Sequence, residues 1–563
     1  MDRGIPRVPL AFMLILTVLG SAFAFLPAVN PTSSASTTTT PSTNSIGSVN
    51  IGYFANINHA PAVIGIANGD FQKALGPSTT IHTFLFPSGG PEMVALLAGK
   101  LDIAYVGPSP AVNAYIQSNG TGLVILGGVA SGGAVFVVQN SSKITSAKDL
   151  GGKTFAAPGI GNTQDIALRY YLMENGYKTT TNGGNVTVLD ATNANIVTLF
   201  AEGKVDGAWV PEPYGEVLMQ QLGGKLFLDE RSLWPGGSFS TAELVVRTQF
   251  LQQHADVVQE IVSADVAETN WINKNPSLAE ADLNSSLVSL TGQGYSQSIL
   301  GAALARLAFT YDPLETSVAV QAEHAWALGD LTQNPTNLSG LYDLSVLSSV
   351  LAADGLPGLS TTSVSCSHAS VLVGTTTSCK ATVQGTGSAA TGTVTWSGGG
   401  SGSFSSAPCK LSPQKSFSTC SAKFTPTVAG SPLTITASYG GDPKNAPSAG
   451  AYSLTVTLKV TRTTVSCKPT SAVAGSSETI TCTARVTGNS PRGTVSWSQS
   501  GSGSVSFNST ACTLASVGPT QGTCSVTMTG KTAGRVTGQA TYGGNRSNQG
   551  SSGTFRLTIK DAT

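Results

Sequence analysis

Two stretches about a hundred residues apart carry nearly the same sequence: residues 97–110 read LAGKLDIAYVGPSP, and residues 201–213 read AEGKVDGAWVPEP. In each, an amphipathic helix (91–98 or 195–201) should end at a left-handed glycine, a short strand should follow, and a Pro-x-Pro should open the next helix. One structural unit is thus used twice. Each copy puts a polar residue, Ser109 or Glu212, at the carboxyl end of a strand, where ligands bind in open α/β sheets. Two such lobes facing each other predict a clamshell receptor for a small solute, whereas a merely recurrent helix-to-strand turn is the alternative.

The composition limits the functions that the chain could have. With 563 residues it is too long for one hydrophobic core, and two to four domains are expected. Its formal net charge of zero does not favour nucleic acid as a partner, because nucleic-acid binding needs a basic surface. Only 11% of the residues are charged. This pattern suits an exported protein, and we advance the hypothesis that it works in acid.

The N-terminal residues resemble an export signal. Arg3 and Arg7 precede an apolar run over residues 8–26, which contains small residues at Ala22 and Ala24. We predict a signal peptide or a membrane anchor over residues 1–28, since the run is long enough to span a bilayer, and a Ser/Thr-rich linker over 29–47. The protein is therefore expected outside the cytoplasm, secreted or at the cell surface.

All eight cysteines lie in the last two hundred or so residues, in two sets of four with similar spacing. The motif TVTW at 393–396 returns as TVSW at 494–497, which indicates a tandem duplication of an all-β module, over residues 360–458 and 460–560. An even cysteine count in an exported protein favours disulfides over a metal site. Short loops predict local pairs: Cys366–Cys379, Cys409–Cys420, Cys467–Cys482 and Cys512–Cys524.

Residues 48–357 alternate strands and helices, which predicts an α/β fold with lobe I at about 48–135 and 243–357 and lobe II at about 136–242. Four strand-to-helix turns carry glycine, hydroxyls or amides, and such turns leave backbone N–H groups free to bind an anion. Ordinary helix capping and lobe packing are the alternatives for these residues. The candidate ligand-binding residues are Asn56, Ser88, Gly89, Ser109, Gly161, Asn162, Thr163, Trp209, Glu212 and Tyr214.

Several motifs in order carry a family resemblance over about residues 49–356: FPSGGPEM at 86–93, GPSP at 107–110, SAKDLGGK at 146–153, GNT at 161–163 and WVPEPY at 209–214. Together they resemble the nitrate/taurine/aliphatic-sulfonate family of ABC-transporter solute-binding proteins. The resemblance implies a type II-like periplasmic-binding fold that closes on an anionic solute. It further implies that Ser109 and the turn at 161–163 hold the anionic group, with Ser88 and Gly89 nearby. The tail resembles bacterial immunoglobulin-like repeats, which implies spacer or adhesive modules.

These features predict a non-enzymatic receptor that passes taurine, an alkanesulfonate or a related small solute to an ABC permease in the membrane. Nitrate, bicarbonate and a thiamine-pyrimidine precursor remain alternative solutes, and a surface adhesin with a vestigial receptor domain is an alternative function. An enzyme is disfavoured because the first domain has no cysteine and no evident Ser/His/Asp set or metal-ligand cluster. No cofactor is expected. If Glu212 contacts the solute, its carboxylate favours a zwitterion such as taurine, whereas capping its own helix or pairing with a lobe residue is the structural alternative.

Overall fold

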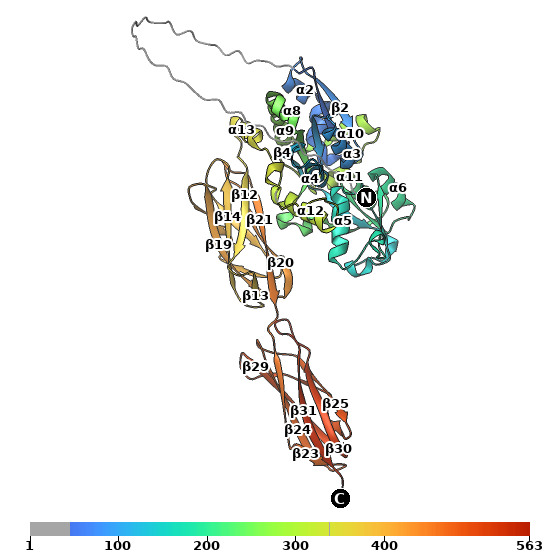
Figure 1. The fold of residues 1–563 in the computed structure, drawn as a ribbon, viewed down its shortest axis with the longest axis vertical. Coiled ribbons are helices and arrows are strands. Elements are labelled where there is room, and N and C mark those ends of the chain that lie inside the picture. Colours follow the sequence, from blue (N-terminus) through green and yellow to red (C-terminus); the bar gives the residue numbers. More distant parts are fainter. Residues whose placement is uncertain (1–45, 337, 563) are drawn as a thin grey trace, which may run out of the picture. The chain divides into compact units, whose positions relative to one another are not determined.

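A computed structural model describes residues 46–562 except residue 337 (Figure 1). The predicted export segment and most of the predicted linker lie outside these residues. No helix in the described part of the chain is long and apolar enough to cross a membrane. The described chain consists of an α/β region followed by two all-β repeats.

Lobe I is built on a six-stranded sheet of order β11-β4-β10-β3-β1-β2. Strands β1, β2 and β3 are parallel, while β10 runs antiparallel between β3 and β4. The strands are β1 (Ser48–Tyr53), β2 (Thr80–Leu85), β3 (Ile103–Val106), β4 (Leu123–Gly132), β10 (Ser240–Arg247) and β11 (Leu307–Phe309). The helices are α1 (Ala60–Ala67), α2 (Asp70–Leu75), α3 (Gly89–Leu97), α4 (Pro108–Gln117), α8 (Thr248–Gln253), α9 (Ala255–Lys274), α10 (Pro276–Thr291), α11 (Gln297–Leu304), α12 (Glu315–Ala327) and α13 (Ser345–Ala353).

Lobe II is built on a five-stranded sheet of order β7-β6-β8-β5-β9. All residues of β5 and β8 are buried, as expected for central strands covered on both faces. The strands are β5 (Ala134–Val138), β6 (Thr154–Pro158), β7 (Thr187–Ala191), β8 (Gly207–Pro211) and β9 (Lys225–Asp229). The helices are α5 (Thr163–Glu174), α6 (Asn193–Ala201) and the short α7 (Tyr214–Glu216).

The two lobes share one strand arrangement, which explains the repeated sequence. Five strands of lobe I follow the order β2-β1-β3-β10-β4, and lobe II follows β7-β6-β8-β5-β9. The first copy of the repeat contains β3 and the second contains β8, and these strands hold the same place in their sheets. Gly99 and Gly203, which end the two preceding helices, both have positive φ, at 69° and 64°. The chain crosses between the lobes at Gly132–Gly133 and again between β9 and β10. The α/β region thus has the two-lobed periplasmic-binding-protein fold.

The tail forms two sandwiches with the same topology. In the first, one sheet has the order β12-β14-β19-β16 and the other β13-β21-β20-β15-β17; in the second, the orders are β22-β24-β29-β26 and β23-β31-β30-β25-β27. These matching sheets confirm the duplication of an all-β module and are consistent with immunoglobulin-like sandwiches. Their strands are β12 (Ser360–Cys366), β13 (Ser370–Leu372), β14 (Thr377–Gly385), β15 (Thr393–Ser397), β16 (Gly402–Ser405), β17 (Cys409–Lys410), β18 (Ser412–Pro413), β19 (Phe417–Pro426), β20 (Gly430–Tyr439), β21 (Ser448–Thr457), β22 (Arg462–Lys468), β23 (Ser471–Val473), β24 (Thr479–Thr487), β25 (Thr494–Gly501), β26 (Ser504–Phe507), β27 (Ala511–Thr513), β28 (Ala515–Ser516), β29 (Gln521–Thr532), β30 (Gly534–Tyr542) and β31 (Ser551–Lys560).

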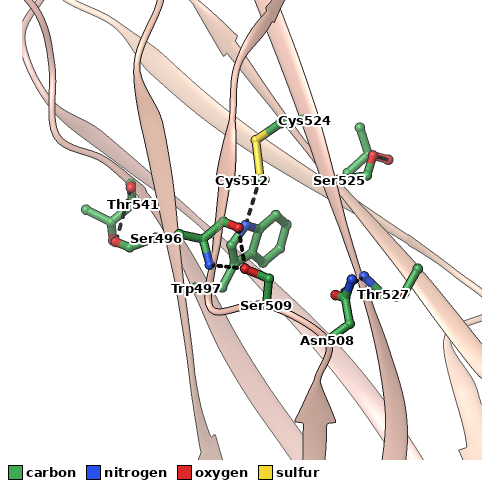
Figure 2. Close-up of a disulfide and its surroundings, with 11 residues drawn as sticks. Ser496, Trp497, Asn508, Ser509, Cys512, Cys524, Ser525, Thr527 and Thr541 are labelled. Carbon is green, nitrogen blue, oxygen red and sulfur yellow. Dashed lines mark hydrogen bonds between the residues drawn. A yellow bond between two sulfur atoms is a disulfide. The ribbon is translucent and has the colours of Figure 1, made fainter.

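The four predicted disulfides are confirmed. In each repeat one disulfide joins neighbouring strands of one sheet, and the other joins the two sheets. Figure 2 shows the inter-sheet disulfide of the second repeat, Cys512–Cys524, with the indole Nε1 of Trp497 donating to Cys512 Sγ at 3.2 Å. Trp396 makes the same contact with Cys409 Sγ in the first repeat, at 3.1 Å. The repeated tryptophan of the TVTW and TVSW motifs thus packs against the inter-sheet disulfide.

Candidate functional site

A small cavity lies between the lobes, at the carboxyl ends of their central strands. The cavity is small: the positions open to the centre of a water molecule fill about 30 Å³. This is room for roughly two water molecules. A larger solute therefore requires the lobes to separate. Both lobes supply lining residues: Phe54, Asn58, Gly107 and Thr241 from lobe I, and Pro158, Asn162, Thr163, Gln164 and Pro211 from lobe II.

Two buried hydroxyls without partners mark the first turns of helices α4 and α5. Ser109 Oγ and Thr163 Oγ1 have no hydrogen-bond partner, although both residues are only 4% exposed. A Cβ atom at Gly107 would lie 2.7 Å from Thr163 Oγ1, so glycine allows the two helix starts to approach. Because the first backbone N–H groups of a helix also lack intrahelical partners, these turns offer donors that suit an anion.

The Asn162 side chain connects the lobes at this cavity. Its Oδ1 accepts a hydrogen bond from Gly89 N at 3.1 Å, and its Nδ2 donates to Pro158 O at 2.8 Å. Gly161 has a φ of 76°, and its N–H donates to Asp165 Oδ2 at 2.8 Å. Ser88, the residue before α3, is half-buried, and its side chain makes no capping bond. Four predicted residues, Ser88, Gly89, Asn162 and Thr163, thus lie where the two lobes meet.

The cavity also has lining residues that sequence reasoning did not select. Phe54 stacks on His59 with ring centroids 4.5 Å apart, and Phe54 N donates to His59 Nδ1 at 3.3 Å. Burial lowers the pKa of His59 to about 3, so this imidazole is neutral. Asn58 Nδ2 donates to Thr241 O at 3.4 Å, and Asn58 Oδ1 is without a partner. The polar run after β1 was the available sequence signal for Asn58, whereas Thr241 reaches the site only through the return of the chain into lobe I.

Three other candidates lie away from the cavity lining. Trp209 is fully buried in the lobe II core, stacks on Phe136, and donates from Nε1 to Glu230 Oε2 at 2.7 Å. This packing corresponds to the structural alternative for Trp209, because its side chain turns from β8 into the core. Asn56 caps the following turn by accepting from Ile57 N at 2.7 Å. Tyr214 packs on the other lobe II core cluster.

Glu212 is also outside the lining, and its carboxylate has protein partners. Its Oε2 accepts from Glu216 N at 3.0 Å, and its Oε1 lies 3.5 Å from Arg306 Nη1. Arg306 also pairs with Glu216 and with Asp229. Burial raises the pKa of Glu212 to about 7, against the opposing effects of the Glu216 N–H and Arg306. These contacts correspond to the structural alternative for Glu212, in which it caps its own helix and forms an ion pair.

A second set of contacts between the lobes joins α5 to α12. Arg169 on α5 forms ion pairs with Asp165 on the same helix and with Asp330, which follows α12 in lobe I. The next residue on α5, Tyr170, stacks on His324 of α12 with ring centroids 3.6 Å apart. Both contacts must break or shift if these helices separate. Among the described residues, no group of three or more His, Cys, Asp or Glu side chains is arranged to hold a metal ion.

Comparison with known proteins finds a family model and several relatives that are similar to the α/β region. Residues 43–283 match the model of the NMT1-like family. The chain is 27% identical over 234 residues to the taurine-binding periplasmic protein of Escherichia coli K12, covering 41% of this chain and 70% of the relative. It is 28% identical over 236 residues to a putative aliphatic sulfonates-binding protein of Bacillus subtilis 168, covering 41% and 67%. The structure of the alkanesulfonate-binding protein of Xanthomonas axonopodis pv. citri bound to MOPS aligns with a TM-score of 0.44 and 20% identity, covering 51% of this chain and 96% of that one.

Proposed function

From the match of residues 43–283 to the NMT1-like family and the cavity between the lobes, we propose that this protein is an extracytoplasmic solute-binding component of an ABC importer. It captures a small anionic solute as the lobes close and delivers it to a membrane permease. The observation that carries the proposal is the pair of buried, unpartnered hydroxyls, Ser109 Oγ and Thr163 Oγ1, at two helix starts. A buried hydroxyl without a hydrogen-bond partner destabilises the fold, and a bound anion would supply the missing acceptor.

The chemistry of the lining supports an anion without an amine. The nine lining residues include amides, hydroxyls and aromatic or small groups, but none is charged. An amine buried in this cavity would lack a carboxylate, since that of Glu212 is held by Arg306 and Glu216 N. We therefore favour an alkanesulfonate over taurine as the solute class.

The test is calorimetry and thermal unfolding of the full chain with ethanesulfonate, butanesulfonate, taurine, nitrate and bicarbonate. A ligand present at a hundred times its dissociation constant should stabilise the protein by about 2.7 kcal/mol. Thr163→Val keeps the shape of the side chain and removes the hydroxyl. It should weaken the bound anion by roughly tenfold, since hydrogen bonds to charged groups contribute about 1.5–3 kcal/mol.

Thr198→Val on α6 provides the matched control, because Thr198 is exposed and lies in the same lobe. It should leave affinity unchanged. Equal losses in both variants, or the absence of binding by every anion tested, would contradict the proposal. Conversion of a bound solute into a product would instead identify an enzyme.

A further inference from the structure

The zero net charge of the chain conceals two oppositely charged parts. Residues 46–358 contain 13 Lys/Arg and 26 Asp/Glu, a formal charge of −13. Residues 359–563, which form the two repeats, contain 15 Lys/Arg and only 3 Asp/Glu, a formal charge of +12. The zero net charge of the whole chain therefore does not weigh against a polyanionic partner for the tail.

The positive charges of the tail are available for binding. All fifteen Lys and Arg side chains in residues 359–563 are exposed. None of them takes part in an ion pair with any described residue. Of the three acidic residues, Asp442 is engaged by its own repeat, where it accepts from Thr391 N at 2.7 Å and from Lys444 N at 2.8 Å. The repeats thus present cations that no internal carboxylate neutralises.

The strand registers place these cations in pairs. On β22 and β24, Arg462 lies opposite Thr487 and Arg485 lies opposite Thr464, so the two arginines are diagonal neighbours on one face. On the other sheet, Arg535 lies opposite Thr558 and Arg556 lies opposite Thr537, which gives a second diagonal pair. Diagonal neighbours of this kind are about 7–8 Å apart. The first repeat has another diagonal pair, Lys380 and Lys423, on β14 and β19.

We propose that the two repeats bind an anionic polysaccharide chain outside the cell through these cationic faces. The cations lie on both sheets of the second sandwich, where a flexible polymer can reach them all, whereas a flat membrane would meet one face at a time. The charge is spread along strands and the surrounding exposed residues are largely Ser and Thr, which suits repeated carboxylates better than a single shaped ligand. A single-stranded nucleic acid is a weaker fit, because its bases need exposed aromatic side chains to stack on. Phe417 is the only Phe, Tyr or Trp exposed in the described part of the repeats.

Binding of the full chain to immobilised polygalacturonate, a chain of repeated carboxylates, tests this proposal, with neutral dextran as the blank. Binding should occur at low salt and weaken steeply as salt is added, because the polymer's counterions are released on binding. The variant R462Q/R485Q/R535Q/R556Q should bind at least about tenfold more weakly and with a smaller salt slope. The variant R462K/R485K/R535K/R556K should retain most of the binding, which separates loss of charge from loss of fold.

The matched control removes four exposed lysines from the acidic domain, residues 46–358, as K73Q/K100Q/K148Q/K178Q. It changes the whole-chain charge by the same amount and should change polymer binding by less than about twofold. An equal loss in this control would overturn the proposal. Binding to phosphatidylglycerol vesicles but not to polygalacturonate would identify a membrane surface instead. Salt-dependent self-association without polymer binding would identify the acidic domain of a second copy as the partner.

Discussion

Asn162 of lobe II is hydrogen-bonded to Gly89 of lobe I, with Asn162 Oδ1 and Gly89 N 3.1 Å apart. Gly89 opens α3, and Asn162, which lines the cavity, immediately precedes α5, so the bond joins the starts of two helices from different lobes. The Asn162 side chain therefore lines the cavity and also holds the two lobes together.

Replacing Asn162 by Ala removes this connection and should weaken solute binding. Loss of one hydrogen bond between the closed lobes is expected to cost about 1 kcal/mol, or roughly fivefold in affinity. Calorimetry on the full chain with the best anion provides the measurement. Asn195→Ala, at an exposed position of α6, should bind as the unmodified protein does; an equally large effect there would indicate a general loss of fold.

The ion pair of Arg169 with Asp330 should stabilise the closed form. Asp330→Asn leaves Arg169 paired with Asp165 on its own helix, so the fold of lobe II is retained while the contact between the lobes weakens. Because the pair is partly exposed, we expect an effect of about 1 kcal/mol, seen chiefly as faster solute release in stopped-flow measurements. The exposed Asp190→Asn is the control. An unchanged release rate in Asp330→Asn would show that this pair does not resist opening.

Glu212→Gln distinguishes a ligand contact from a structural role. Since the Glu212 carboxylate bonds to Glu216 N and lies 3.5 Å from Arg306, the substitution should change affinities for taurine and for ethanesulfonate by the same factor. Parallel titrations of the two ligands measure this directly. A selective loss of at least about tenfold for taurine would restore a zwitterion as the solute.

The acidic groups buried in lobe I predict greater stability in mild acid. Burial raises the pKa of Asp265, which accepts from Tyr105 OH, to about 7, and burial together with nearby Asp70 raises that of Glu268 to about 7. The folded state thus binds more protons than the unfolded state between about pH 4 and 7. The free energy of unfolding should therefore rise as pH falls from about 7.5 to 5. Each kcal/mol gained should raise the melting temperature by roughly 2–4 °C.

Glu268→Gln should raise the melting temperature at pH 7.5 and reduce its pH dependence, because Glu268 Oε1 is buried without a partner. Glu260→Gln, exposed on the same helix α9, should change neither. A melting temperature that rises with pH across this range would contradict the assignment of these carboxyls.

The inter-sheet disulfide of each repeat should contribute substantially to its stability. Cys409→Ser/Cys420→Ser opens a loop with a sequence separation of 11, for which the chain-entropy model gives about 3 kcal/mol. Denaturant unfolding of the full chain, followed by the fluorescence of tryptophan, checks the value. The corresponding pair in the second repeat, Cys512→Ser/Cys524→Ser, should have an effect of similar size, since its separation is 12.

The sequence determined the features that depend on local spacing. The repeated helix-glycine-strand pattern predicted two lobes, and both lobes have the same strand order because each copy folds into the same unit. The short spacing of the cysteines predicted their pairing, since each pair closes a small loop between neighbouring segments. The charge of the tail was also visible in the sequence, but only when the repeats were counted separately from the acidic domain.

The tertiary structure alone decided which candidates meet at the cavity. Trp209 and Pro211 lie two residues apart on β8, yet Trp209 enters the core while Pro211 lines the cavity. Glu212 is held by Arg306, a residue of lobe I far along the chain, and Thr241 reaches the site because the chain returns from lobe II into β10. Sequence periodicity describes one element at a time, whereas a cleft is formed by the faces that separate elements turn toward each other when they pack.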